Sequence, residues 1–162
     1  MMTYLQVFLN SIKLPNKEAM FRLNRIGMDV ALIYMFILLA IVCIPELIDR
    51  LTATSGFGAE LNIIFQLIYF FMFYYLPLTI IALISLSLIA YIGKGIASLM
   101  QRKLRFPTLW KLSAFTTTLP LLLYTIIKFI IDVNDRFLFI VFIYAVGLLI
   151  RMISIYPKRR VR

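Results

Sequence analysis

Residues 74–112 read YYLPLTIIALISLSLIAYIGKGIASLMQRKLRFPTLWKL, which is a long apolar run followed by a short basic loop. Residues 74–92 carry no charged side chain, and five cations then follow within 18 residues: Lys94, Arg102, Lys103, Arg105 and Lys111. A transmembrane helix that ends in the cytoplasm has this pattern, because the loops kept inside carry an excess of Lys and Arg. We therefore interpret residues 75–95 as a membrane span whose C-terminal end faces the cytoplasm.

The composition indicates an integral membrane protein. The chain has 162 residues, of which 63% are hydrophobic, and its mean hydropathy is +0.98. Soluble domains contain roughly 45–50% apolar residues. The net charge of +10 could indicate a nucleic-acid partner, but the cations stand beside apolar runs and not on one solvated face. In that position Lys and Arg orient helices and contact anionic lipid headgroups. We therefore expect membrane lipids as partners on the cytoplasmic face, and no nucleic acid.

Three further apolar segments have close to the ~20 residues that a membrane-spanning helix needs. They are residues 30–48, 112–131 and 137–156. In the resulting four-span arrangement, fourteen of the seventeen Lys and Arg residues fall on one side, and only Arg50, Lys128 and Arg136 fall on the other. The predicted fold is therefore an all-α, polytopic membrane domain over residues 1–162, in the plasma membrane with both termini cytoplasmic.

The apolar run that starts at Leu61 is too long for one span. A continuous helix over residues 61–100 would measure ~60 Å, whereas the hydrocarbon core of a bilayer is ~30 Å thick. The segment contains either two spans broken at Pro77, or one span preceded by an outer interfacial helix or helical extension over residues 61–73. We favour the second arrangement, because two spans would place the basic loop 94–111 opposite the basic terminal segments, the PKRRVR tail among them.

The first residues form a short amphipathic pattern. Residues 3–14 place apolar side chains at helical spacing with polar residues between them, at Tyr4, Leu5, Phe8, Leu9 and Ile12. The segment is too short and too polar to span, so we expect it to lie in the cytoplasmic interface plane. A helix that docks a protein partner would have the same pattern.

The basic loop is the first candidate contact surface. It combines Arg102, Lys103 and Arg105 with the aromatic ring of Trp110. This mixture suits a loop that lies against lipid headgroups, with the ring at the interface and the cations toward anionic lipid. We therefore predict that these four residues contact lipid or a partner.

The third predicted span holds the second candidate surface, formed by Thr116, Thr117, Thr118 and Pro120. Pro120 leaves a backbone carbonyl about one turn earlier without a donor, and threonine hydroxyls can satisfy such groups. The patch either stabilises a kinked helix or recognises a lipid or partner. In the preceding span, Gly93 and Ala97 form a small-xxx-small pair, which allows close helix approach either inside one bundle or in a homodimer.

The sequence offers few groups for catalysis. It has no histidine, the commonest general base and metal ligand, and its single cysteine, Cys43, excludes an intramolecular disulfide. The glycines at 93 and 95 are not followed by the GK[ST] of a phosphate loop. No acidic residue falls at the middle of a span, where ion-coupled carriers usually have one. We expect a non-enzymatic protein with no catalytic, cofactor-binding or metal site.

Residues 94–120 contain KLRF, then LWKLSAF, then a threonine-proline step, and residues 9–27 read LNSIKLPNKEAMFRLNRIG. This combination resembles an uncharacterised bacterial membrane family, mostly from Gram-positive organisms, whose members are often labelled maltodextrin-utilisation proteins. It is also distantly similar to Yip-type membrane proteins. The resemblance implies no catalytic residues. Members often have a larger outer insertion after the first span, where this chain has only residues 49–73, and this difference weighs against an outer ligand-binding role.

Two functional hypotheses follow. The favoured one is an accessory or interaction subunit of the cytoplasmic membrane, which contacts a membrane-protein partner, a second copy or lipids. The alternative is a small-solute transporter component or a lipid-handling membrane protein, because the third span is rich in hydroxyls.

Overall fold

An apolar helical stretch near the N-terminus contains the first predicted span. The computed structural model describes residues 4–52, 62–130 and 136–157, apart from the side chains of 136–138, and the regular elements of these residues are all helical. Helix α3 (Met28–Val42) and helix α4 (Ile44–Thr52) are separated only by Cys43. Together they form a 25-residue segment with a mean hydropathy of 2.6, long and apolar enough to cross a membrane.

The second such segment is 37 residues long, from Ile63 to Leu99, with a mean hydropathy of 2.2. It consists of α5 (Ile63–Phe70), the π-helical turn η1 (Phe71–Tyr75) and α6 (Leu76–Leu99). No break separates the three elements. The segment predicted over residues 61–73 is thus a helical extension of α6 from Ile63 onward, while its first residue lies outside the described residues.

The π-helical turn η1 lies directly before Pro77. Proline has no N–H and its ring clashes with the carbonyl four residues back, so it disturbs a regular α-helix. In η1 the Leu76 N–H instead bonds to the Phe71 carbonyl, five residues back, and the helix continues through the proline. The turn also contacts α3, because the Tyr75 hydroxyl donates to the Phe36 carbonyl at 2.9 Å.

The remaining two predicted spans are also helical. Helix α7 (Phe106–Thr116) and helix α8 (Thr118–Lys128) meet at Thr117, and α9 covers Arg136–Ile155. Helix α7 begins six residues before the predicted span and α6 continues to Leu99, so only residues 100–105 of the expected basic loop lie outside a helix.

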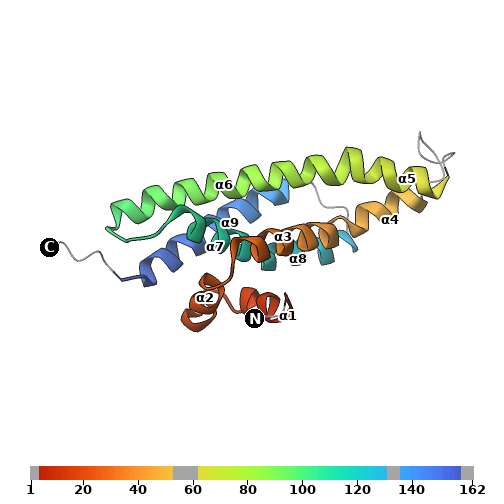
Figure 1. The fold of residues 1–162 in the computed structure, drawn as a ribbon. Helices are drawn as coiled ribbons and strands as arrows, with labels where there is room; N and C mark the ends of the chain where they lie inside the picture. Colours follow the sequence, from red (N-terminus) through yellow and green to blue (C-terminus); the bar gives the residue numbers. More distant parts are fainter. Residues whose placement is uncertain (1–3, 53–61, 131–135, 158–162) are drawn as a thin grey trace.

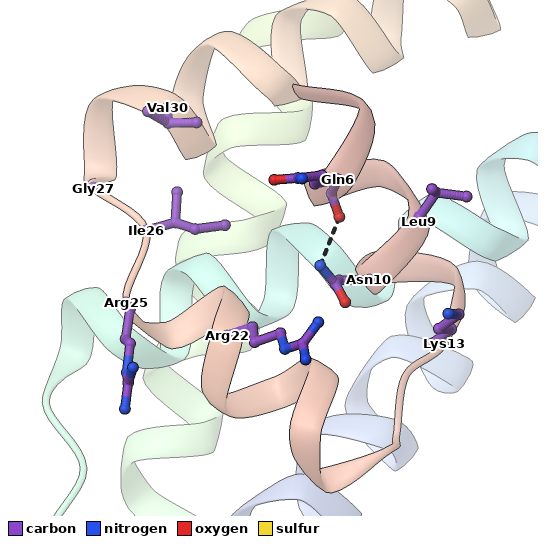
Figure 2. A pocket seen from close by; sticks show the side chains of 9 residues that line it. All are labelled: Gln6, Leu9, Asn10, Lys13, Arg22, Arg25, Ile26, Gly27 and Val30. Carbon is purple, nitrogen blue, oxygen red and sulfur yellow. Dashed lines mark hydrogen bonds between the residues drawn. The ribbon is translucent and has the colours of Figure 1, made fainter. Parts of the chain in front are cut away.

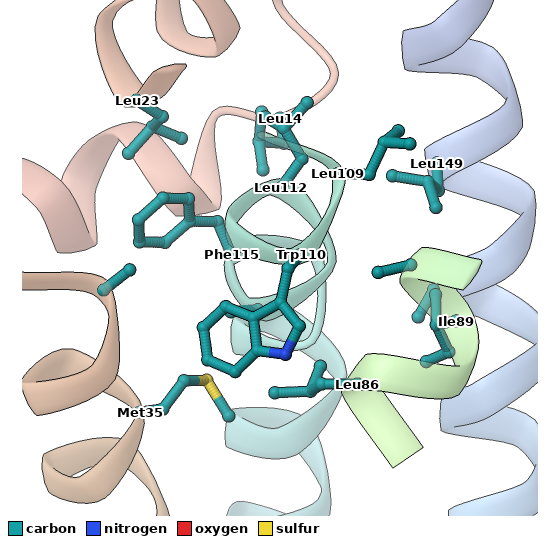
Figure 3. Close-up of a cluster of buried hydrophobic side chains, with 14 of the residues drawn as sticks. Leu14, Leu23, Met35, Leu86, Ile89, Leu109, Trp110, Leu112, Phe115 and Leu149 are labelled. Carbon is teal, nitrogen blue, oxygen red and sulfur yellow. The ribbon is translucent and has the colours of Figure 1, made fainter. Parts of the chain in front are cut away.

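Helix α7 is the centre of the bundle. It packs against α6, α9 and α3, and α3 also packs against α8 (Figure 1). Every residue from Leu112 to Thr118 is buried, which is typical of a helix enclosed on all sides. Around Trp110 and Phe115, apolar side chains converge from the neighbouring helices, such as Met35 of α3 and Leu86 of α6 (Figure 3).

Gly93 of α6 allows its helix to approach α9 closely. A Cβ atom at this position would lie 2.6 Å from Cδ2 of Leu149 and 3.6 Å from Cδ2 of Leu109. One turn later, Ala97 is also buried. The small-residue surface therefore packs inside the bundle, which is the first of the two arrangements that the sequence left open.

Two short helices precede the spans and fold back on the bundle. Helix α1 (Tyr4–Ile12) contacts α7 and α8, and α2 (Lys17–Asn24) contacts α7 (Figure 1). The Asn16 side chain accepts a hydrogen bond from the Glu18 N–H and so caps α2. The buried side of α1 is formed by Val7 and Ser11. Most of the predicted apolar face points outward, since Tyr4, Leu5, Leu9 and Ile12 are exposed.

The outer surface of the bundle is unusually apolar. Large aliphatic side chains are exposed along α3, α6, α8 and α9, for example Ile37, Ile81, Ile126 and Ile143. Monomeric soluble proteins rarely expose such extended apolar surface.

Candidate functional site

The predicted hydroxyl patch lies inside the bundle and bonds to its own helix. The Ser113 Oγ donates to the Leu109 carbonyl at 2.8 Å, and the Thr116 Oγ1 donates to the Ser113 carbonyl at 2.7 Å. The Thr117 Oγ1 donates to the Ala114 carbonyl at 2.8 Å. All three hydroxyl-bearing residues are buried. These hydroxyl groups are thus engaged by the protein backbone.

The hydroxyl of Thr118, which also belongs to the predicted patch, connects two helices. Thr118 is fully buried, and its Oγ1 lies 2.8 Å from the Tyr34 hydroxyl of α3. The Tyr34 ring also contacts the Phe115 ring, with 5.5 Å between centroids. This pair fixes the register of α3 against the junction of α7 and α8.

Pro120 is buried just after that junction. Because it has no N–H, the helix loses the hydrogen bond that residue 120 would donate to the Thr116 carbonyl. Helix α7 ends at Thr116, and Thr117 has φ −75° and ψ −12° before α8 begins. Thr116, Thr117, Thr118 and Pro120 are all buried, so they contact the surrounding helices and are not part of the outer surface of the bundle.

Trp110 also differs from the prediction. Its side chain is only 4% exposed, and its Nε1 donates to the Ser87 Oγ of α6 at 3.2 Å. The expected position at headgroup depth assumed a loop, but residues 106–111 are helical, and this turns Trp110 toward α6. The ring is therefore part of the core (Figure 3).

Two cations of the basic segment, Arg102 and Lys111, donate hydrogen bonds to backbone carbonyls of other segments. The half-buried Arg102 donates to the Tyr156 carbonyl just beyond α9. The Lys111 Nζ donates to the Asn24 and Ile26 carbonyls at 2.9 and 2.6 Å. Both contacts occupy carbonyls at helix C-termini, which helical hydrogen bonds leave free. Burial lowers the pKa of the Lys111 ammonium.

Lys103 and Arg105 lie beside Arg102, in the connection between α6 and α7, and both are exposed. Of the four residues predicted to contact lipid or a partner in the basic loop, only these two have fully accessible side chains. The PKRRVR tail was expected on the same face, and its residues 158–162 lie outside the described residues.

At the opposite end, a small ionic cluster joins three segments. Glu46 of α4 pairs with Arg50 and with Lys128 of α8, each at 2.9 Å. The Arg50 guanidinium also lies 5.1 Å from the centroid of the Tyr74 ring of η1. These contacts satisfy the acid within the protein. Among the described residues there is no cluster of His, Cys, Asp and Glu that could hold a metal ion.

A groove of about 680 Å³ opens between α1, α2 and the start of α3 (Figure 2). Three cations line it: Lys13, Arg22 and Arg25. Its other lining residues are Gln6, Leu9, Asn10, Ile26, Gly27 and Val30. No carboxylate lines the groove, and within the described part of the chain none of the three cations forms an ion pair.

In the sequence, these three cations indicated only the orientation of the predicted spans. A sharper signal was present, because Arg22 and Arg25 stand three residues apart and so share one side of a helix. The missing information was the fold-back of α1 on α2, which brings Lys13 to the same groove. That contact joins separate elements and is not visible in local periodicity.

A family model described as "Protein of unknown function (DUF1189)" matches residues 52–153. The chain belongs to this family. The matched part of this DUF1189 protein runs from the end of α4 to near the end of α9, and it includes α7 with its hydroxyls. The groove residues, 6–30, lie before it. No curated protein and no solved structure matches the chain.

Proposed function

We propose that this protein is a four-span, non-enzymatic protein of the cytoplasmic membrane that acts as an accessory or interaction subunit. The spans lie near residues 30–48, 75–95, 112–131 and 137–156, and both termini are cytoplasmic. The observation that carries the proposal is the contrast between the outer surface of the bundle and its interior. Its outside exposes apolar side chains along four helices, whereas the buried hydroxyl groups of α7 and of the adjoining Thr117 bond to their own backbone.

The distribution of charge supports the orientation. Lys103 and Arg105 are exposed between α6 and α7, and α9 also ends on this side of the bundle (Figure 1). An excess of Lys and Arg is typical of cytoplasmic loops. The resemblance to proteins labelled for maltodextrin utilisation makes a sugar-uptake system the first partner to test, and the Yip-type similarity is compatible with a role in lipid and protein contacts.

Photo-crosslinking tests the interaction. A photoreactive phenylalanine analogue is placed at Ile84 or Tyr91, which are exposed on α6, and at the buried Leu86 as the matched control. We expect discrete protein adducts from the two exposed positions and none from the control. Mass spectrometry after purification in mild detergent identifies the adduct. Recovery of the uncrosslinked chain alone from both exposed positions, at any expression level, would count against an accessory role.

A transporter component remains the alternative because α7 and α8 are rich in hydroxyls. Its test is solute uptake into vesicles by the wild type and by a variant with Thr116, Thr117 and Thr118 replaced by Val. Wild-type uptake equal to that of empty vesicles rules out transport by the chain alone.

A further inference from the structure

The groove between α1 and α2 gathers three cations, and the Asp29 carboxylate, which lies beside the lining residue Gly27, forms no ion pair with them. In Figure 2 the Arg22 side chain extends from α2 toward Asn10 of α1, and Lys13 lies on the α1 side. The nearest acids in sequence, Glu18 and Asp29, do not line the groove. Like charges gathered in a recess repel one another, and a bound anion removes this repulsion.

The groove also has hydrogen-bonding and apolar parts. The Asn10 Nδ2 donates to the Gln6 carbonyl at 2.7 Å, which holds the side-chain amide at the groove wall. Leu9, Ile26 and Val30 supply apolar lining. Ligand sites are typically 300–1,000 Å³, mostly apolar, with a few polar groups that fix orientation. A recess of about 680 Å³ therefore has the size and chemistry for a small anionic group with an apolar extension.

We propose that this groove binds the phosphate of an anionic phospholipid headgroup, with Lys13 and Arg22 as the principal contacts and Arg25 at the edge. The inference rests on the proposed membrane location and adds a defined lipid site to it. Arg and Lys both recognise phosphate oxygens, and the guanidinium of Arg can do so with two parallel hydrogen bonds.

The surroundings of the groove favour a lipid over a soluble phosphate. Leu9 both lines the groove and belongs to the exposed apolar face of α1, together with Tyr4, Leu5 and Ile12. On the other side, Val30 leads along α3 to the exposed Ile33. Acyl chains can follow these faces while the phosphate stays in the groove. A free phosphate would use only the cations.

Native mass spectrometry of the detergent-purified full chain tests the proposal. Phosphatidylglycerol and phosphatidylcholine are titrated separately, and the apparent Kd is measured for the wild type and for K13Q/R22Q. The variant K17Q/R151Q is the matched control, because it loses the same charge from exposed positions outside the groove. Each cation near an anionic lipid contributes about fivefold in affinity, so K13Q/R22Q should bind phosphatidylglycerol about 30-fold more weakly. The control should change less than about threefold.

Two further variants separate charge from shape. Asn10→Trp keeps every cation but fills the groove, and it should also weaken phosphatidylglycerol binding. The charge-preserving K13R/R22K should bind as the wild type does. Thermal unfolding of each variant verifies that it is folded.

Three results would overturn the proposal. Equal losses in K13Q/R22Q and K17Q/R151Q would mean that the whole basic surface attracts lipid. Unchanged binding in K13Q/R22Q would exclude the groove. Displacement of phosphatidylglycerol by millimolar inorganic phosphate would assign the groove to a soluble phosphate compound. None of these results affects the α6 crosslinks, so failure of the groove is distinguishable from failure of the proposed function.

Discussion

Replacing Gly93 with alanine should destabilise the bundle, whereas the same change at Gly95 should not. The added Cβ at Gly93 would lie 2.6 Å from Cδ2 of Leu149, and no atom lies within 4 Å of a Cβ at Gly95. Leu149 is itself 1% exposed, so its methyl group cannot move aside without displacing other core atoms. Overpacking of this kind costs about 1–3 kcal/mol.

The comparison between the two glycines isolates the steric cost. Both lie in α6, and alanine in place of glycine inside a helix gains about 0.5–1 kcal/mol at each. This gain cancels in the difference, so G93A should be less stable than G95A by about 1–3 kcal/mol. For a chain of this size, such a difference corresponds to a Tm lower by roughly 2–12 °C.

Unfolding by sodium dodecyl sulfate in mixed micelles measures this difference. Trp110 reports on it, because it is the only tryptophan and is buried against α6. A third variant, G147A in α9, repeats the control, since a Cβ there also meets no atom within 4 Å. If G93A and G95A have the same free energy of unfolding, the close approach of α6 and α9 at Gly93 does not exist in the membrane.

Three other changes test separate contacts. Lys111→Met leaves the carbonyls of Asn24, the last residue of α2, and of Ile26 without their donor and should destabilise the protein by about 1–3 kcal/mol. Because burial lowers the Lys111 pKa from 10.5, the unfolded chain binds the proton more tightly, so wild-type stability should rise with pH as 10.5 is approached. The Met variant should lack this rise in a pH series of micelle unfolding. Tyr34→Phe and Thr118→Val should show a coupling energy of about 1 kcal/mol in a double-mutant cycle, and additive effects would mean that their hydroxyls are not paired. In a cysteine-free background, a cysteine at Thr108 should react with an impermeant maleimide only after permeabilisation and one at Asn62 should react from outside; external labelling at Thr108 would restore the two-span reading of residues 61–100.

Local pattern was sufficient for the helical class and for the position of the apolar segments. The run 30–48 lies within α3 and α4. Charge favoured one span over residues 75–95, preceded by an interfacial helix or a helical extension, and the structure has a continuous helix from Ile63 to Leu99. The pattern could not supply the orientation of individual side chains. Trp110 was assigned to the interface from its basic neighbours, but the start of α7 at Phe106 turns it inward.

The candidate contact residues show the same limit. Hydroxyl-rich and basic segments look alike whether they face lipid or another helix, because the difference depends on which helix covers them. Lys111 donates to the carbonyl of Asn24, the last residue of α2, which is 87 residues earlier in the chain. The groove exists only because α1 folds back on α2. Both require tertiary packing, to which a single sequence gives little access.

The unbroken helix from Ile63 to Leu99 is mismatched to any ordinary bilayer. Its 37 residues extend over about 55 Å at 1.5 Å per residue, and a tilt of about 20° lets only about 21 of them fit within a ~30 Å hydrocarbon core. The excess falls largely on α5, where Ile63, Ile64 and Phe65 are each more than 60% exposed. If residues 75–95 span the membrane as proposed, the surrounding lipid must thicken locally or the apolar helix α5 must be shielded beyond the bilayer. The length of this one helix would then make the protein sensitive to the thickness of its membrane.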